Sequence, residues 1–231
     1  MRAAVLFACG VVGVAAAAGP AGEPTAAEYA RSADNLKRIA RAVQLYEAAN
    51  GRLPNDVYLP KSPDKRPILS WRVLIVPYLE PKADFDRVRL DEPWDGQNNK
   101  KLIPKMPRVF APARGTAVPG MTYYRTFSGK GLLFGYDRGQ GMKLKDVTDG
   151  PASTALVVEA AEPVVWTRPD ELKLPPNDAP KLGGMFGGVA HVALLDGSVI
   201  RLRADPDPAE LRKLIEPADG GKVNLDALRA P

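Results

Sequence analysis

The chain has 231 residues, of which 45% are hydrophobic and 26% charged, so it is long and apolar enough to form one packed domain. Its 23 prolines indicate much loop and few long elements. The net charge of +5 comes from scattered Lys and Arg, and only 7% of the residues are aromatic, which argues against a nucleic-acid-binding surface.

The first 18 residues have the pattern of a secretory signal peptide. Met1 and Arg2 give a positive start, an apolar run follows to residue 18, and small residues at its end suit a signal peptidase. The run is shorter than the roughly 20 residues that span a bilayer. We therefore expect cleavage and export to the periplasm, cell surface or medium, with an uncleaved membrane anchor as the alternative. Cys9 is the single cysteine and lies within this run, so we expect a mature chain without disulfides, thiolates or cysteine-bound metal.

Residues 19–24 are rich in Gly, Pro and Ala and indicate a linker before a long amphipathic helix at 25–50. Thr25 and Glu28 have the spacing of a capping box, and Gly51 suits the left-handed residue that ends a helix. Apolar residues recur at helical spacing along the segment. We expect this stripe to be buried against the strands that follow.

The rest of the chain predicts short helices and then strands. Ser70 is placed to cap a helix at 70–79, whose last turn Pro77 should distort. Beyond it we expect short helices at 83–88 and 97–103, strands at 121–127, 131–136 and 155–159, a loop at 178–184 and a helix at 208–215. This order indicates an α+β fold with the long N-terminal helix packed on an antiparallel sheet. We expect a single loop-rich domain at 25–223 and a C-terminal tail at 224–231.

The strongest local signal is a β-hairpin around Asp196 and Gly197, flanked by apolar segments. This dipeptide is typical of a two-residue type I′ turn. Such a loop would pair Leu195 with Ser198, and it sets which side chains share a face.

The same register bears on the only histidine, His191. It would lie opposite Leu202 on the apolar face, with Arg201 and Arg203 on the other face. We interpret His191 as a buried, hydrogen-bonded side chain, because no nucleophile and orienting carboxylate accompany it in sequence as a Ser-His-Asp triad requires.

Loops carry the remaining candidate chemistry. Trp166 and Asp170 are a candidate ligand loop, although a tryptophan in a Pro-rich loop is more often a core residue. Loop carboxylates are the ligand type that calcium takes, without an EF-hand spacing; the candidates are Asp137, Asp146, Asp149, Asp170, Asp178 and Asp196. No cofactor is otherwise indicated.

Several segments occur in an order that resembles a large bacterial family of prepilin-like proteins of unknown function with an H-x9-DG C-terminal signature. They lie at 35–39, 51–54, 69–74, 77–80, 90–95, 146–150 and 165–170, and end with the signature hairpin residues Asp196, Gly197 and Ser198. The resemblance spans about 32–223 and implies a pseudopilin-like fold in an extracytoplasmic protein. The family is linked by name both to type IV pilin-like secretion and to solute binding.

The chain departs from that family in two ways. It has no Gly-Phe junction and no acidic residue in the apolar run, which argues against assembly into a filament. Phe186 stands ten positions before Asp196, where the signature has histidine, so no role of that histidine transfers to His191.

Together these features predict a non-enzymatic exported protein with a structural or interaction role at the cell envelope or in secretion. Its expected partner is an envelope or secretion-apparatus protein, with no nucleic acid, and with the membrane only if the N-terminal segment stays uncleaved. The alternative is an exported module that binds a solute or glycan.

Overall fold

The computed structural model describes residues 22–58, 66–81, 87–135, 140–176 and 178–230. The helices in these ranges are α1 (Ala26–Asn50), α2 (Trp71–Leu74), α3 (Val76–Leu79), α4 (Pro208–Ile215) and α5 (Leu225–Leu228). The strands are β1 (Val57–Tyr58), β2 (Pro67–Leu69), β3 (Met121–Arg125), β4 (Ala155–Val165), β5 (Val189–Leu194) and β6 (Val199–Arg203).

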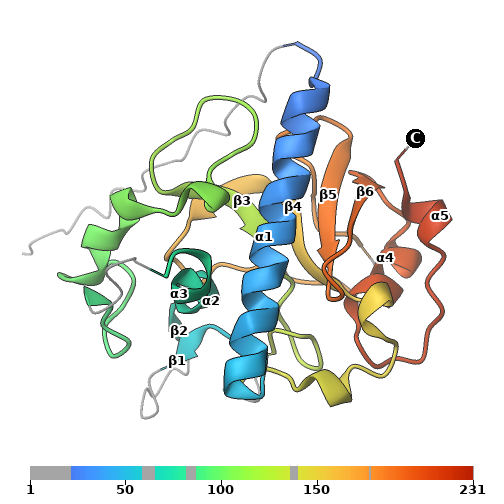
Figure 1. Ribbon diagram of the computed structural model, residues 1–231. Coiled ribbons are helices and arrows are strands. Elements are labelled where there is room, and N and C mark those ends of the chain that lie inside the picture. The colour runs from blue at the N-terminus through green and yellow to red at the C-terminus, as the bar shows by residue number, and fades with distance from the viewer. Residues whose placement is uncertain (1–21, 59–65, 82–86, 136–139, 177, 231) are drawn as a thin grey trace, which may run out of the picture.

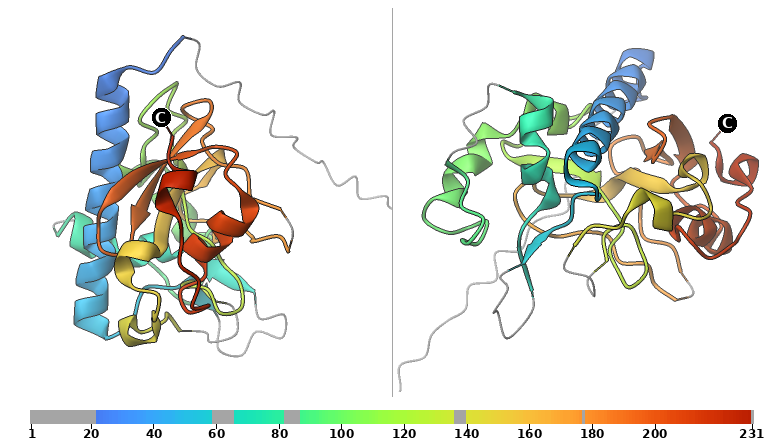
Figure 2. Two further views of the ribbon diagram at one scale, coloured as in Figure 1. Left: turned by 90° about the vertical axis from the view of Figure 1, so that its right-hand side faces the viewer. Right: turned by 60° about the horizontal axis from the view of Figure 1, so that its bottom comes forward.

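A four-stranded antiparallel sheet in the order β3-β4-β5-β6 is the centre of the molecule. Helix α1 crosses one face of this sheet, and α4 and α5 cover the other face (Figures 1 and 2). Strands β1 and β2 form a separate small ribbon. The expected α+β architecture, a long N-terminal helix on an antiparallel sheet, is confirmed.

Helix α1 has the ends that its sequence predicts. The Thr25 hydroxyl accepts a hydrogen bond from the Glu28 N–H at 3.2 Å, and the Glu28 carboxylate accepts one from the Thr25 N–H at 2.8 Å. Gly51 ends the helix with φ 68° and donates its N–H to Glu47. The middle of its apolar stripe, including Leu36 and Val43, is fully buried against the sheet, and Tyr29 and Tyr46 towards its ends are half-buried.

The helix expected at 70–79 is split in two. Ser70 caps α2 through its hydroxyl, which accepts a hydrogen bond from the Arg72 N–H at 3.2 Å. The chain then breaks at Ile75 and restarts as α3, in whose first turn Pro77 lies. Proline cannot continue the hydrogen-bond ladder of a helix but is well tolerated in a first turn, so the break accommodates it.

The strand expectations are partly corrected. Residues 131–135 form turns with one isolated bridge at Phe134, and position 136 lies outside the described residues. Strand β4 runs six residues beyond the expected end at 159, as far as Val165. Of the expected short helices, the one at 83–88 lies mostly outside the described residues, and the other is a 3-10 helix, η2 (Asn99–Lys105).

The end of the chain is packed rather than a tail. Helix α4 lies where it was expected, with Asp207 as its cap. Asn224 caps α5, whose Leu228 is fully buried, and Arg229 forms a bridge with Leu202 of β6. No helix in the described ranges has the length and apolar character to cross a membrane.

Candidate functional site

The hairpin between β5 and β6 has a three-residue loop, not the expected two-residue turn. The Leu194 N–H donates to the Ser198 carbonyl at 2.8 Å, and the Gly197 N–H donates to the Leu194 carbonyl at 2.9 Å. Gly197 has φ 91°. This geometry is a turn followed by a left-handed glycine bulge, the usual three-residue hairpin. The Asp196 carboxylate caps the loop by accepting from the Ser198 N–H and hydroxyl.

One extra loop residue shifts the strand register by one. His191 pairs with Arg201, not with Leu202, and Ala190 pairs with Leu202. The expected faces were therefore wrong for β6, since a one-residue shift moves every side chain to the other face. Arg201 lies on the α1 side, with its guanidinium 5.7 Å from the Tyr29 ring centroid, and Leu202 packs in the cluster under α4.

His191 is buried, as interpreted from the sequence, and it belongs to a polar cluster beneath α1. Its Nδ1 lies 3.0 Å from Oε2 of Glu159, which is fully buried in β4 and also accepts the His191 N–H at 2.7 Å. Ser32 of α1 donates its hydroxyl to Glu159 and lies 3.1 Å from the hydroxyl of Tyr124. Burial, followed by the Glu159 charge, raises the pKa of Tyr124. The carboxylate stands between the serine and the histidine, and these atoms lie inside the core, so the order and access of a catalytic triad are absent from this cluster.

A second buried cluster surrounds Arg72. Its guanidinium donates to the Ser70 hydroxyl at 2.7 Å and to Oε2 of Glu171 at 3.1 Å, and lies 2.8 Å from Oε1 of that carboxylate. Glu171 also accepts the Thr126 N–H at 2.7 Å. Asp56 accepts the Trp71 N–H at 3.0 Å. Burial, aided by the charge of Glu171, raises the pKa of Asp56 to about 7.

Sequence reasoning missed both clusters. A detectable signal was present: Glu159 interrupts the apolar run 155–161, and Arg72 lies between two buried hydrophobic residues. Charges at such positions are seldom buried unless they are paired.

The two residues of the expected ligand loop have different environments. The Trp166 indole is 3% exposed, donates its N–H to the Ile103 carbonyl at 3.1 Å and stacks on Phe110. It is a core residue rather than an exposed platform. The Asp170 carboxylate lies 2.9 Å from Arg125 and 3.4 Å from Arg168.

The loop carboxylates do not gather in the described part of the chain. No group of three or more His, Cys, Asp or Glu side chains suited to a metal occurs there. Asp149 instead accepts backbone N–H groups of Asp219 and Gly220, at 2.9 and 3.1 Å. Asp137 lies outside the described residues.

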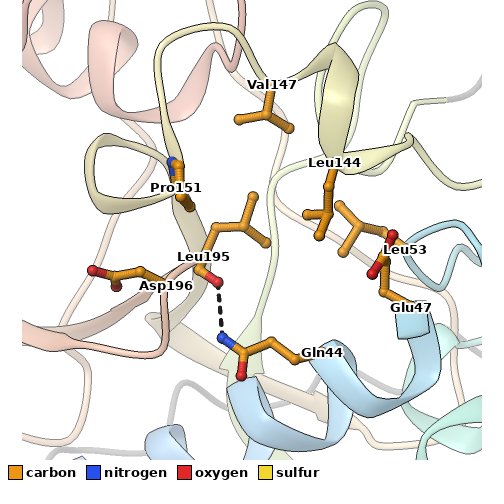
Figure 3. A pocket seen from close by; sticks show the side chains of 8 residues that line it. All are labelled: Gln44, Glu47, Leu53, Leu144, Val147, Pro151, Leu195 and Asp196. Carbon is orange, nitrogen blue, oxygen red and sulfur yellow. Dashed lines mark hydrogen bonds between the residues drawn. The ribbon is translucent and has the colours of Figure 1, made fainter.

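The signature hairpin does border an apolar cleft of about 280 Å³ (Figure 3). The lining comes from α1, the loop after it, the 3-10 helices η5 (Leu144–Asp146) and η6 (Pro151–Ser153), and the hairpin loop: Gln44, Glu47, Leu53, Leu144, Val147, Pro151, Leu195 and Asp196. Backbone and side-chain hydrogen bonds hold these segments together. Leu195 donates its N–H to Thr154, Asp196 donates its N–H to Pro151, and Gln44 donates its amide to the Leu195 carbonyl at 3.1 Å.

The cleft has an apolar floor and an acidic rim. Leu53 and Leu195 are buried in its wall, while Leu144 is 41% exposed. Glu47 and Asp196 stand at its edge, and neither makes an ion pair with a described residue. The cleft therefore suits an apolar group that carries a positive charge nearby.

A larger and more polar cavity of about 370 Å³ lies around Asp56, beyond the same end of α1. It shares Leu53 with the apolar cleft and offers mixed aromatic and polar side chains, including Tyr46, Arg52 and Tyr58.

Comparison with known proteins links part of the chain to one family. Residues 26–112 match the model of SBP_bac_10, described as "Protein of unknown function (DUF1559)". The match includes the segments from 35–39 to 90–95 that carried the resemblance, and it ends before the hairpin. None of the curated proteins and none of the solved structures matches the chain.

Proposed function

We propose that this protein is a non-enzymatic, exported interaction protein of the pseudopilin-like type, and that it docks an envelope or secretion-apparatus partner in the cleft of Figure 3. The observation that carries the proposal is the cleft itself, whose aliphatic wall is assembled from five separate segments. The carboxylates of Glu47 and Asp196 stand at its rim, and neither makes an ion pair with a described residue. The signal-peptide pattern supports export. The long helix on an antiparallel sheet supports the pseudopilin-like type.

The acidic rim defines the kind of partner. A segment that inserts an aliphatic side chain against Leu144 and Leu195 would place a neighbouring Lys or Arg beside Glu47. Burial of the aliphatic group gives affinity, and the charge pair gives selectivity. The apolar stripe of α1 is not the docking surface, because that side of the helix already packs on the sheet.

Site-specific photo-crosslinking in the native envelope tests this proposal. A photoreactive residue at Leu144 should capture a partner whose crosslinked peptide has an aliphatic residue next to Lys or Arg. A synthetic peptide of that sequence should bind the purified protein, and Glu47→Lys should weaken this binding at least about tenfold by charge repulsion.

The matched controls use exposed positions outside the cleft. A photoreactive residue at Val118, which is 56% exposed, should not capture that partner, and Asp34→Lys on the same helix should leave peptide affinity unchanged. Equal capture at Leu144 and Val118 would contradict the proposal.

The polar cavity favours a second function, binding of a solute or glycan. Tyr46 and Tyr58 offer aromatic rings, and Arg52 and Asn55 offer planar polar groups, the mixture that positions a small polar ligand. Saturation-transfer NMR with a panel of neutral oligosaccharides separates the two functions. Sugar binding that Arg52→Ala abolishes, while Glu47→Lys leaves it intact, would favour the second function.

A further inference from the structure

A groove between α1 and α3 gathers positive charge beside an aromatic residue. It has a volume of about 280 Å³ and is lined by Lys37, Arg38, Arg41, Ala42, Tyr78 and Leu79. Helix α3 packs directly on α1 at this point (Figure 1). The groove shares no lining residue with the cleft of Figure 3 or with the polar cavity.

The three basic side chains are close in space and unneutralised. They occupy positions i, i+1 and i+4 of one helix, so Lys37 and Arg41 are neighbours one turn apart, an arrangement that destabilises a helix through repulsion. All three are exposed, and none makes an ion pair or hydrogen bond within the described part of the chain. Asp34 on the same helix and Glu80, which follows Leu79 at the end of α3, do not pair with them.

The opposite wall is held in place by other contacts. The ring of Tyr78 makes an edge contact with Tyr46 at 5.8 Å between centroids. Its hydroxyl accepts the side-chain amide of Asn50, the last residue of α1, at 3.3 Å. Ala42 is 1% exposed and forms a closed floor. The groove thus combines an aromatic wall that is held by its contacts with three exposed cations.

We propose that this groove binds the phosphoryl group of an anionic ligand. Guanidinium groups match phosphate oxygens in pairs, and an ammonium adds a point charge. A phosphoryl group carries one negative charge as a diester and up to two as a monoester, and its several oxygens can accept from all three cations, whereas a carboxylate has only two oxygens. An exported protein meets such groups both as soluble phosphates and as headgroups of anionic lipids.

Binding measurements on the purified mature chain test the site. In a first experiment, which tests a soluble ligand, pyrophosphate is titrated into the protein by calorimetry. In a second, which tests a lipid headgroup, co-sedimentation of the protein with phosphatidylglycerol vesicles is compared with its co-sedimentation with phosphatidylcholine vesicles. Since each Lys or Arg near an anionic surface contributes about fivefold, we expect Lys37→Gln/Arg38→Gln/Arg41→Gln to weaken binding about a hundredfold. Binding of wild-type protein should also weaken as salt is raised.

A matched variant removes the same charge elsewhere. Lys100, Lys101 and Lys105 are exposed on η2, outside the groove, and their triple replacement by Gln should leave binding within about twofold of wild type. Circular dichroism melts check that both variants fold.

The two experiments have distinct outcomes. Pyrophosphate binding lost only in the groove variant supports a soluble phosphoryl ligand, and vesicle binding without pyrophosphate binding supports a headgroup. Equal losses in the two triple variants, equal affinity for a glutamate-rich peptide, or no binding in either experiment would overturn the proposal.

Discussion

At the scale of single residues, two buried carboxylates have different surroundings. Glu159 accepts the Ser32 hydroxyl and the His191 backbone N–H, and its Oε2 lies 3.0 Å from Nδ1 of the His191 ring. These contacts join α1, β4 and β5 at one point beneath the helix. The Asp56 carboxylate accepts the backbone N–H of Trp71, and burial, followed by the Glu171 charge, raises its pKa. Hydrogen bonds therefore tie Glu159 into a network between three elements, while the raised pKa of Asp56 makes that carboxyl responsive to pH near neutrality.

The raised pKa of Asp56 predicts that the fold gains stability as the pH falls from 7 towards 4. The folded-state pKa, about 7, lies above the unfolded value of 3.8, so the folded protein binds the extra proton in this window. We expect Asp56→Asn to keep the hydrogen bond from Trp71 and remove the buried charge. At pH 8 it should raise the free energy of unfolding by at least about 1 kcal/mol.

Urea unfolding of wild type and Asp56→Asn at pH 5 and pH 8 measures this effect. The difference between the two proteins should shrink at pH 5, where wild-type Asp56 is protonated. A difference that is the same at both pH values would refute the assignment.

At the scale of elements, the length of the hairpin loop determines which side chains of β6 lie on each side of the sheet. Gly197 takes the left-handed conformation that closes the three-residue loop, next to Gln44 of α1. The loop also carries two of the residues that line the cleft. Its backbone geometry therefore sets both the strand register and the position of the cleft wall.

The positive φ of Gly197 gives a direct prediction, because a residue with a side chain would be strained there. Gly197→Ala should lower the melting temperature by about 2–4 °C, which corresponds to about 1 kcal/mol, because alanine disfavours a positive φ. Its Cβ would also lie 3.3 Å from Nε2 of Gln44. Gly197→Asn should recover part of the loss, because asparagine tolerates the left-handed region.

Gly129→Ala is the matched control for this measurement. Its φ is not positive, and an added Cβ would make ordinary contact with Leu132 at 3.4 Å. Differential scanning calorimetry should show a smaller drop in melting temperature for Gly129→Ala than for Gly197→Ala. Equal drops in the two variants would argue against a special need for glycine at position 197.

At the scale of the whole molecule, the sheet is buried on both faces. One hydrophobic cluster joins α1 to residues such as Leu156 and Ala193, and a second joins α4 and α5 to residues such as Val192 and Leu202. This two-sided burial explains why β5 is apolar at nearly every position instead of alternating. It also explains why the last residues of the chain pack as α5.

The proposed export predicts that the N-terminal segment is removed. Protein recovered from the periplasm or medium should lack the first 18 or so residues, as the small residues before Gly19 predict. Because Cys9 would leave with the leader, this mature form should show no free thiol with Ellman's reagent. N-terminal sequencing and intact mass measure the cleavage, and an intact Met1 confined to the cytoplasm would count against export.

The sequence by itself determined the elements whose signals are local. The Thr25–Glu28 capping box, the apolar stripe and Gly51 define α1 because a helix is bounded and oriented by residues within a few positions of each other. The same holds for the hairpin, whose existence Asp196 and Gly197 predict; the burial of His191 was predicted correctly, although from a register that differs by one residue.

Only the tertiary structure decided the loop length, the register and the sites. The dipeptide occurs in both two-residue and three-residue loops, and the three-residue loop of this structure makes hydrogen bonds with Thr154, Pro151 and Gln44. The cleft, the polar cavity and the basic groove each join residues that are distant in the chain. Such sites depend on packing between segments, which no local pattern encodes.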